Sequence, residues 1–268
     1  MYSEGNGSVL RFEDANPQIK KKQKDYIKLL NEKIALEKEC DFIDFRYIKT
    51  FGVFMLKLLK LQAKCEKCSL ILRILKRCND EKREFNKEAA MQEIANELKP
   101  MYAQIDRVRN KKKEELKLPT NTEEKDASRI LRKIVGLIHP DINKKAYRND
   151  RVKKLWDKSI EYYNETDSRK LNEVYLEAKN ILQDLKVKQN EILNEEELDL
   201  EIEFVKEEIF LLHNLGPYPF KNVLQNENEV INHKSFLLSE IEETEEVLED
   251  FTNDLLELGI DIDDFDIV

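Results

Sequence analysis

The chain has 268 residues, of which 38% are charged and 41% are hydrophobic, and its formal net charge is −9. This acidic balance argues against general nucleic-acid binding. No apolar run reaches the roughly 20 residues that a membrane-spanning helix needs, so we expect a soluble, cytoplasmic protein with neither nucleic acid nor membrane as a partner.

Only six glycines and six prolines interrupt the sequence, which predicts long elements. Apolar and polar residues nowhere alternate between turn signals, so helix is the only regular structure that the pattern supports. We therefore expect an all-α fold in which long antiparallel helical hairpins or coiled coils flank a small helical module. The expected segments are a flexible N-terminus at 1–16, N-terminal coiled-coil helices at 17–118, the module at 119–187, a C-terminal antiparallel helical hairpin at 188–260, and an acidic tail at 261–268.

The first helix is predicted to begin at Asn16-Pro17, an N-cap residue followed by a proline. It should end at Thr50-Phe51-Gly52, where glycine allows the chain to reverse and a second helix to pack antiparallel on the first. Asn79-Asp80 marks the next turn, and a third helix should run from Phe85 to Lys117. The apolar seam of the first helix has Lys33 at an intervening position and otherwise consists of Tyr26, Leu29, Leu36, Cys40, Ile43 and Tyr47.

Cys65 and Cys68 form a CxxC pair, a spacing found in zinc and redox sites. Both also lie on a seam with spacings of four and three residues, made of Phe54, Leu58, Leu61, Cys65, Cys68, Leu72 and Leu75. A structural zinc site needs a second ligand pair, and neither Cys40 nor Cys78 has a neighbouring Cys or His at ligand spacing. We expect the pair to be small buried hydrophobic residues, with no metal and no other cofactor.

Within the module, Thr120 with Glu123, or Asn121 with Glu124, has capping-box spacing at the start of a helix that should end at Ile138. One side of this helix is apolar and contains Ile130, Leu131, Ile134, Val135, Leu137 and Ile138. The other side is basic and contains Lys125, Arg129, Arg132 and Lys133. The helix leads into His139-Pro140-Asp141, and we expect these three groups to project from a corner of the surface.

A second module helix should begin at Asn149 or Asp150 and end near Asn164, and Asp167 should cap the next helix. The run from Arg132 to Asn143, followed by a variable loop and this aromatic-rich helix, resembles helix II, the HPD loop and helix III of a J-domain (DnaJ-like) protein. More narrowly, the chain resembles a bacterial J-domain protein with coiled-coil flanks. The further residues that carry this resemblance are Tyr47–Gly52, Leu155-Trp156, Tyr162–Asn164 and Pro217–Phe220.

The resemblance implies a co-chaperone that docks on a DnaK-type chaperone and stimulates its ATP hydrolysis. It assigns His139, Pro140 and Asp141 to the functional core, and Lys125, Arg129, Arg132 and Lys133 to the docking face. An aspartate held by a preceding proline can accept a bidentate pair from a partner arginine, whereas the basic residues mainly raise the association rate. The chain departs from the family because no tyrosine-rich helix precedes residue 122; the helix from Phe85 to Lys117 is the candidate for its place.

Beyond the module, one seam contains Leu198, Ile202, Val205, Ile209 and Leu212, and another contains Val230, Leu237, Ile241, Leu248, Phe251, Leu255 and Leu258. A turn at Gly216–Phe220 separates them, so the two arms should form the C-terminal hairpin, through which a client, a scaffold protein or a second copy could bind.

Two function classes remain, a J-domain co-chaperone and a structural coiled-coil scaffold or tether whose HPD tripeptide is only a helix stop. A zinc or thiol-redox protein is a third. No nucleophile with a paired base and no phosphate-binding loop is visible, so we expect no enzyme and no catalytic residues.

Overall fold

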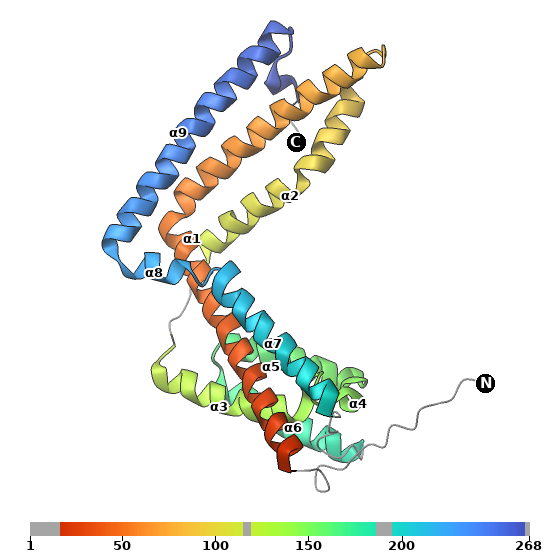
Figure 1. The fold of residues 1–268 in the computed structure, drawn as a ribbon, viewed down its shortest axis with the longest axis vertical. Helices are drawn as coiled ribbons and strands as arrows, with labels where there is room; N and C mark the ends of the chain where they lie inside the picture. Colours follow the sequence, from red (N-terminus) through yellow and green to blue (C-terminus); the bar gives the residue numbers. More distant parts are fainter. Residues whose placement is uncertain (1–16, 115–118, 186–194, 266–268) are drawn as a thin grey trace, which may run out of the picture. The chain divides into compact units, whose positions relative to one another are not determined.

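The computed structural model describes residues 17–114, 119–185 and 195–265, and every regular element within them is helical (Figure 1). This confirms the predicted all-α class. The predicted flexible segment 1–16 lies outside the described residues. The elements are α1 (Pro17–Asp80), α2 (Lys87–Lys113), α3 (Asn121–Ile138), α4 (Lys144–Tyr147), α5 (Asp150–Asn164), α6 (Ser168–Asp184), α7 (Glu195–Leu215), α8 (Phe220–Gln225), α9 (Glu227–Glu257) and a 3-10 helix, Ile262–Phe265.

The predicted chain reversal at Gly52 is wrong, because α1 continues through Gly52 to Asp80. A single glycine costs a helix only about 1 kcal/mol relative to alanine, and the flanking Ile48 and Phe51 are buried, so packing outweighs that cost. A Cβ atom added at Gly52 would lie 3.7 Å from Cδ of Lys112 in α2. The helix therefore does not turn at this glycine, and an added Cβ atom would make only ordinary van der Waals contacts there.

The predicted turn at Asn79-Asp80 is confirmed as the end of α1. The predicted third helix is confirmed as α2, which begins at its N-cap residue Asn86 and continues through Pro100. The break at Gly216–Phe220 is also confirmed, since α7 ends at Leu215 and α8 begins at Phe220.

The chain divides into two compact units that interleave along the sequence. Unit 1 contains Met1–Asp41 and Leu116–Tyr218, and unit 2 contains Phe42–Glu115 and Pro219–Val268. This division differs from the five consecutive segments expected from the sequence. In particular, α7 belongs to unit 1 and α9 to unit 2, so the two predicted arms of the C-terminal hairpin have different packing partners.

The core of unit 2 is formed by the end of α1 with α2, α9 and the 3-10 helix. It consists of Cys68, Leu70, Ile71, Ile74, Ala90, Ile94, Leu98, Leu255 and Phe265. Cys68 is fully buried, as predicted, whereas Cys65 is half-buried and its thiol donates to the Thr244 carbonyl at 3.6 Å. Burial raises the pKa of both thiols, that of Cys68 to about 11. Both groups therefore stay protonated near neutral pH, as packing residues should.

The core of unit 1 joins α3, α5 and α6 to the beginning of α1 and to α7 (Figure 1). From α1 it takes Ile19, Tyr26, Leu30 and Ile34, and from α7 it takes Leu198 and Val205. The expectation that the helix from Phe85 to Lys117 supports the module is wrong, because α2 belongs to unit 2. The start of α1 provides that support.

Candidate functional site

Helix α3 begins with the predicted capping box. The Thr120 backbone N–H donates to the Glu123 carboxylate at 2.8 Å, and the Glu123 N–H donates to the Thr120 hydroxyl at 3.3 Å. Its apolar side is buried against α5 and α6, while Lys125, Arg129, Arg132 and Lys133 are exposed, as the amphipathic pattern predicts. Asp126 pairs with Arg129 at 3.0 Å, and Lys133 lies over the Tyr175 ring.

The loop after α3 is held by Asn143, which is 1% exposed. Its amide nitrogen donates to the Leu137 carbonyl at 3.1 Å, and its side-chain oxygen accepts from the Ala146 N–H at 3.1 Å. The N–H groups of Ile142 and Asn143 both donate to the His139 carbonyl. These bonds fix the backbone of His139-Pro140-Asp141, so the loop presents its side chains in one arrangement.

His139 does not project from a surface corner, and that expectation is wrong: the residue is only 7% exposed. Its ring lies edge-on against Trp156, with centroids 4.7 Å apart. Nδ1 accepts from the Asp141 N–H at 3.2 Å, so the proton of the neutral ring is on Nε2. Burial lowers the pKa of His139 to about 4, although the nearby Asp141 carboxylate opposes this shift. The imidazole is therefore neutral near pH 7.

Asp141 is more accessible than His139, because its side chain is 41% exposed. One carboxylate oxygen accepts from the Tyr26 hydroxyl at 3.4 Å, which joins the loop to the start of α1. Burial, followed by the nearby charge of Asp141, raises the pKa of Tyr26 well above its ordinary value. Tyr26 thus remains a hydrogen-bond donor to Asp141 at any physiological pH.

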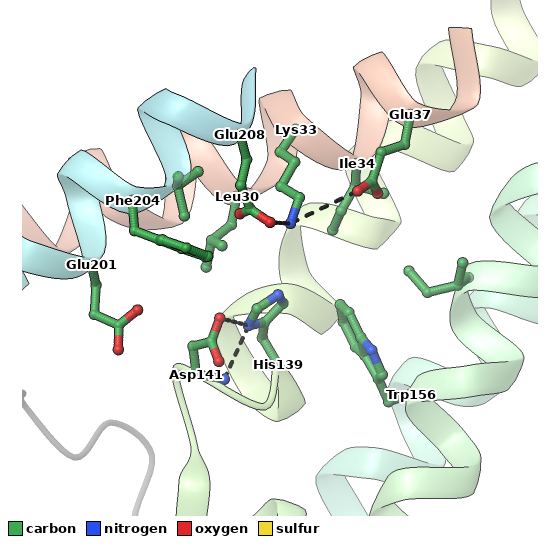
Figure 2. A pocket seen from close by; sticks show the side chains of 12 residues that line it. Leu30, Lys33, Ile34, Glu37, His139, Asp141, Trp156, Glu201, Phe204 and Glu208 are labelled. Carbon is green, nitrogen blue, oxygen red and sulfur yellow. Dashed lines mark hydrogen bonds and ion pairs between the residues drawn. The ribbon is translucent and has the colours of Figure 1, made fainter. Parts of the chain in front are cut away.

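A cavity of about 310 Å³ lies over the His139 ring (Figure 2). Besides His139 and Asp141, it is lined by Leu30, Lys33, Ile34 and Glu37 of α1, Trp156 and Ile160 of α5, and Glu201, Phe204, Val205 and Glu208 of α7. Lys33 pairs with Glu208 at 2.7 Å and lies 3.8 Å from Glu37. Burial raises the pKa of Glu37. Among the residues that line the cavity, the acidic side chains of Glu37, Asp141, Glu201 and Glu208 outnumber the one lysine, Lys33.

The structure separates the predicted site into two parts. His139 and Asp141 line the cavity and Pro140 lies between them in the loop, whereas Lys125, Arg129, Arg132 and Lys133 lie along the exposed side of α3 and do not line the cavity. Sequence reasoning missed the α1 and α7 residues around the loop, because they are more than 50 residues away in the chain. One signal was present: Lys33 is a charged residue on an otherwise apolar seam, and such a position often marks a specific partner.

No protein-family model, curated protein or solved structure matches the chain. In the part of the chain that the structure describes, no helix is long and apolar enough to cross a membrane. The same residues contain no group of three or more His, Cys, Asp or Glu side chains that could hold a metal ion.

Proposed function

We propose that the chain is a J-domain-type co-chaperone, which docks on a cytoplasmic DnaK-type chaperone and stimulates its ATP hydrolysis. The observation that supports this best is the position of the HPD loop. A hydrogen-bonded loop bearing the half-exposed Asp141 connects α3, whose exposed side is basic, to the short helix α4 and then to α5, which packs on α3. This order of elements supports the proposal.

The two parts of the site suit different steps of docking. Exposed lysines and arginines on one helix face raise the rate of encounter with an acidic surface, but each adds little to the final affinity. Asp141 lies on a fixed backbone and can exchange its long hydrogen bond with Tyr26 for a charge-assisted pair with a partner arginine. Neither part provides a nucleophile with a paired base, so the ATP would be hydrolysed by the partner.

A structural scaffold or tether is the second candidate. Its support is the number of large apolar side chains that α9 leaves exposed: Ile231, Phe236, Leu238, Val247 and Leu256. Exposed apolar residues spread along a helix can contact another protein. A scaffold would not need the HPD loop, so the loop variants below separate the two functions.

The test is single-turnover ATP hydrolysis by a DnaK-type chaperone with wild-type protein or Asp141→Asn. The substitution keeps the shape and removes the charge, so we expect stimulation to fall by roughly tenfold or more, as for a lost hydrogen bond to a charged group. Asp150→Asn is the matched control, because Asp150 is an exposed carboxylate of the same unit that pairs with Lys153; this variant should stimulate as wild type does. Equal stimulation by the Asp141 variant and wild type would favour the scaffold.

A further inference from the structure

We propose that α7 is a displaceable cover of the His139 loop, and that the loop engages a chaperone only after α7 has moved away. The inference rests on the proposed co-chaperone function and concerns the regulation of the same site. It follows from the burial of His139, because docking needs an accessible loop.

The first observation is the low exposure of His139. A protein partner binds through an accessible surface, yet His139 is 7% exposed and faces a cavity of about 310 Å³. Figure 2 shows α7 on one side of this cavity, with Phe204 and Glu208 above the His139 ring and Glu201 near Asp141. Moving α7 away would open the loop from that side.

Few apolar side chains of α7 are buried in the core of unit 1. Among its described residues, only Leu198 and Val205 are fully buried, and Ile202 and Ile209 are partly buried against the same core, whereas α6 fully buries Leu171, Val174, Ala178, Ile181 and Leu182. Leu200, Phe204, Leu211 and Leu215 remain exposed on α7. A helix with so little buried apolar surface can leave at a smaller free-energy cost than the rest of the unit.

Ion pairs also join α7 to the rest of unit 1. Lys22 of α1 pairs with Glu195 and Asp199 of α7, each at 2.8 Å, and Lys33 pairs with Glu208 at 2.7 Å. Lys144, just after the loop, lies 3.8 Å from Glu201. These groups are partly exposed, so each pair is individually weak and can be exchanged for contacts with a partner. By linkage, a chaperone that binds the open loop must itself favour the open state.

The test reverses the charges that fasten α7. Asp199→Lys with Glu208→Lys places lysines opposite Lys22 and Lys33 and should open the cover. Adding Lys22→Glu and Lys33→Glu places glutamates opposite the two new lysines and should favour closure again, against the like charges of Glu195 and Glu37. Glu196→Lys with Glu207→Lys is the matched control: these exposed residues of α7 form no ion pair among the described residues, and the change in net charge is the same.

Two readouts separate this inference from the proposed function. Trp156 is the only tryptophan of the chain and lines the cavity, so acrylamide quenching of its fluorescence reports opening without any chaperone. Single-turnover ATP hydrolysis by the chaperone reports docking. Circular dichroism checks that the variants keep their helices. We expect the α7 variant to show stronger quenching and roughly tenfold greater stimulation, with both effects reversed by the restoring changes and absent from the control.

Unchanged quenching in the folded α7 variant would overturn the inference. Stronger quenching with the same stimulation as wild type would also overturn it, because the cover would then not control docking. Stronger quenching in a protein that stimulates no chaperone in any variant would instead contradict the co-chaperone function.

Discussion

At the scale of single residues, His139 shows how burial changes the chemistry of a motif. A histidine at a helix end is expected to be half-charged near neutral pH and to interact with the helix dipole. Here Trp156, α1 and α7 surround the ring, and loss of water lowers its pKa to about 4. In this packed arrangement the group is therefore a neutral imidazole with its proton on Nε2.

This burial predicts a pH dependence of stability. In the unfolded chain His139 has an ordinary pKa of about 6.5, so between pH 6.5 and 4 the unfolded state binds a proton that the folded state does not. The free energy of unfolding should therefore fall as the pH falls through this window, by about 3 kcal/mol at most. Above pH 6.5 both states are neutral and the contribution of His139 vanishes.

The measurement is urea unfolding followed by Trp156 fluorescence at pH 7.5 and 4.5. Carboxyl groups also titrate in this range, so the informative quantity is the difference between wild type and His139→Gln, which should have the shallower pH dependence. His213→Gln serves as the matched control for the loss of a histidine elsewhere in the same unit. The burial of a neutral His139 would be refuted by equal pH dependence in wild type and the His139 variant.

At the scale of secondary-structure elements, glycine has two different roles. Gly52 lies inside α1, where an added Cβ would be 3.4 Å from the Ile48 side chain, an ordinary van der Waals distance. Gly259 follows the end of α9 with a φ of 75°, and its N–H donates to the Leu256 carbonyl at 2.9 Å. Only the second position needs the left-handed conformation that glycine adopts readily.

The two glycines should respond oppositely to alanine. Gly52→Ala should stabilise the protein by about 0.5–1 kcal/mol, because alanine is the better helix former and the site has room. Gly259→Ala should destabilise it by about 1 kcal/mol, because a left-handed conformation strains a residue with a Cβ atom. Thermal unfolding followed by circular dichroism measures both. A marked loss of stability in the Gly52 variant would mean that the site does not have room for a Cβ atom.

At the scale of the whole molecule, the module predicted at 119–187 shares its hydrophobic core with segments outside its bounds. The core around α3, α5 and α6 includes apolar side chains from both sides of this segment in the sequence: Ile19, Tyr26, Leu30, Ile34, Leu198 and Val205. Burying one large apolar side chain contributes about 1.5–3 kcal/mol, so their combined contribution is comparable to the whole stability of a small domain.

A fragment of residues 119–187 should therefore fail to fold cooperatively. Its Trp156 emission should be shifted to the red, and its helical signal should melt without a sharp transition. A second fragment, in which residues 17–41 are joined through a flexible linker to 119–218, contains the described part of unit 1 and should recover both properties. A sharp thermal transition in the short fragment would show that the module folds without α1 and α7.

The sequence by itself determined the local features of this protein. Helix periodicity, the Thr120–Glu123 capping box, the cap residues Asn149 and Asp167, and the exposed basic side of α3 all depend on residues within a few turns of each other. Such patterns are visible in one stretch of chain. They sufficed for the fold class, for most helix ends and for the position of the HPD loop between α3 and α5.

Only the tertiary structure decided what surrounds that loop. The continuation of α1 through Gly52, the two interleaved units and the burial of His139 depend on contacts between distant segments, such as Tyr26 with Asp141 and Lys33 with Glu208. A repeating apolar seam shows that a helix packs on a partner but does not identify the partner, because any similar seam buries the same apolar area. Because α1 and α7 pack around the loop, His139 is buried, although the sequence predicted that it would project from the surface.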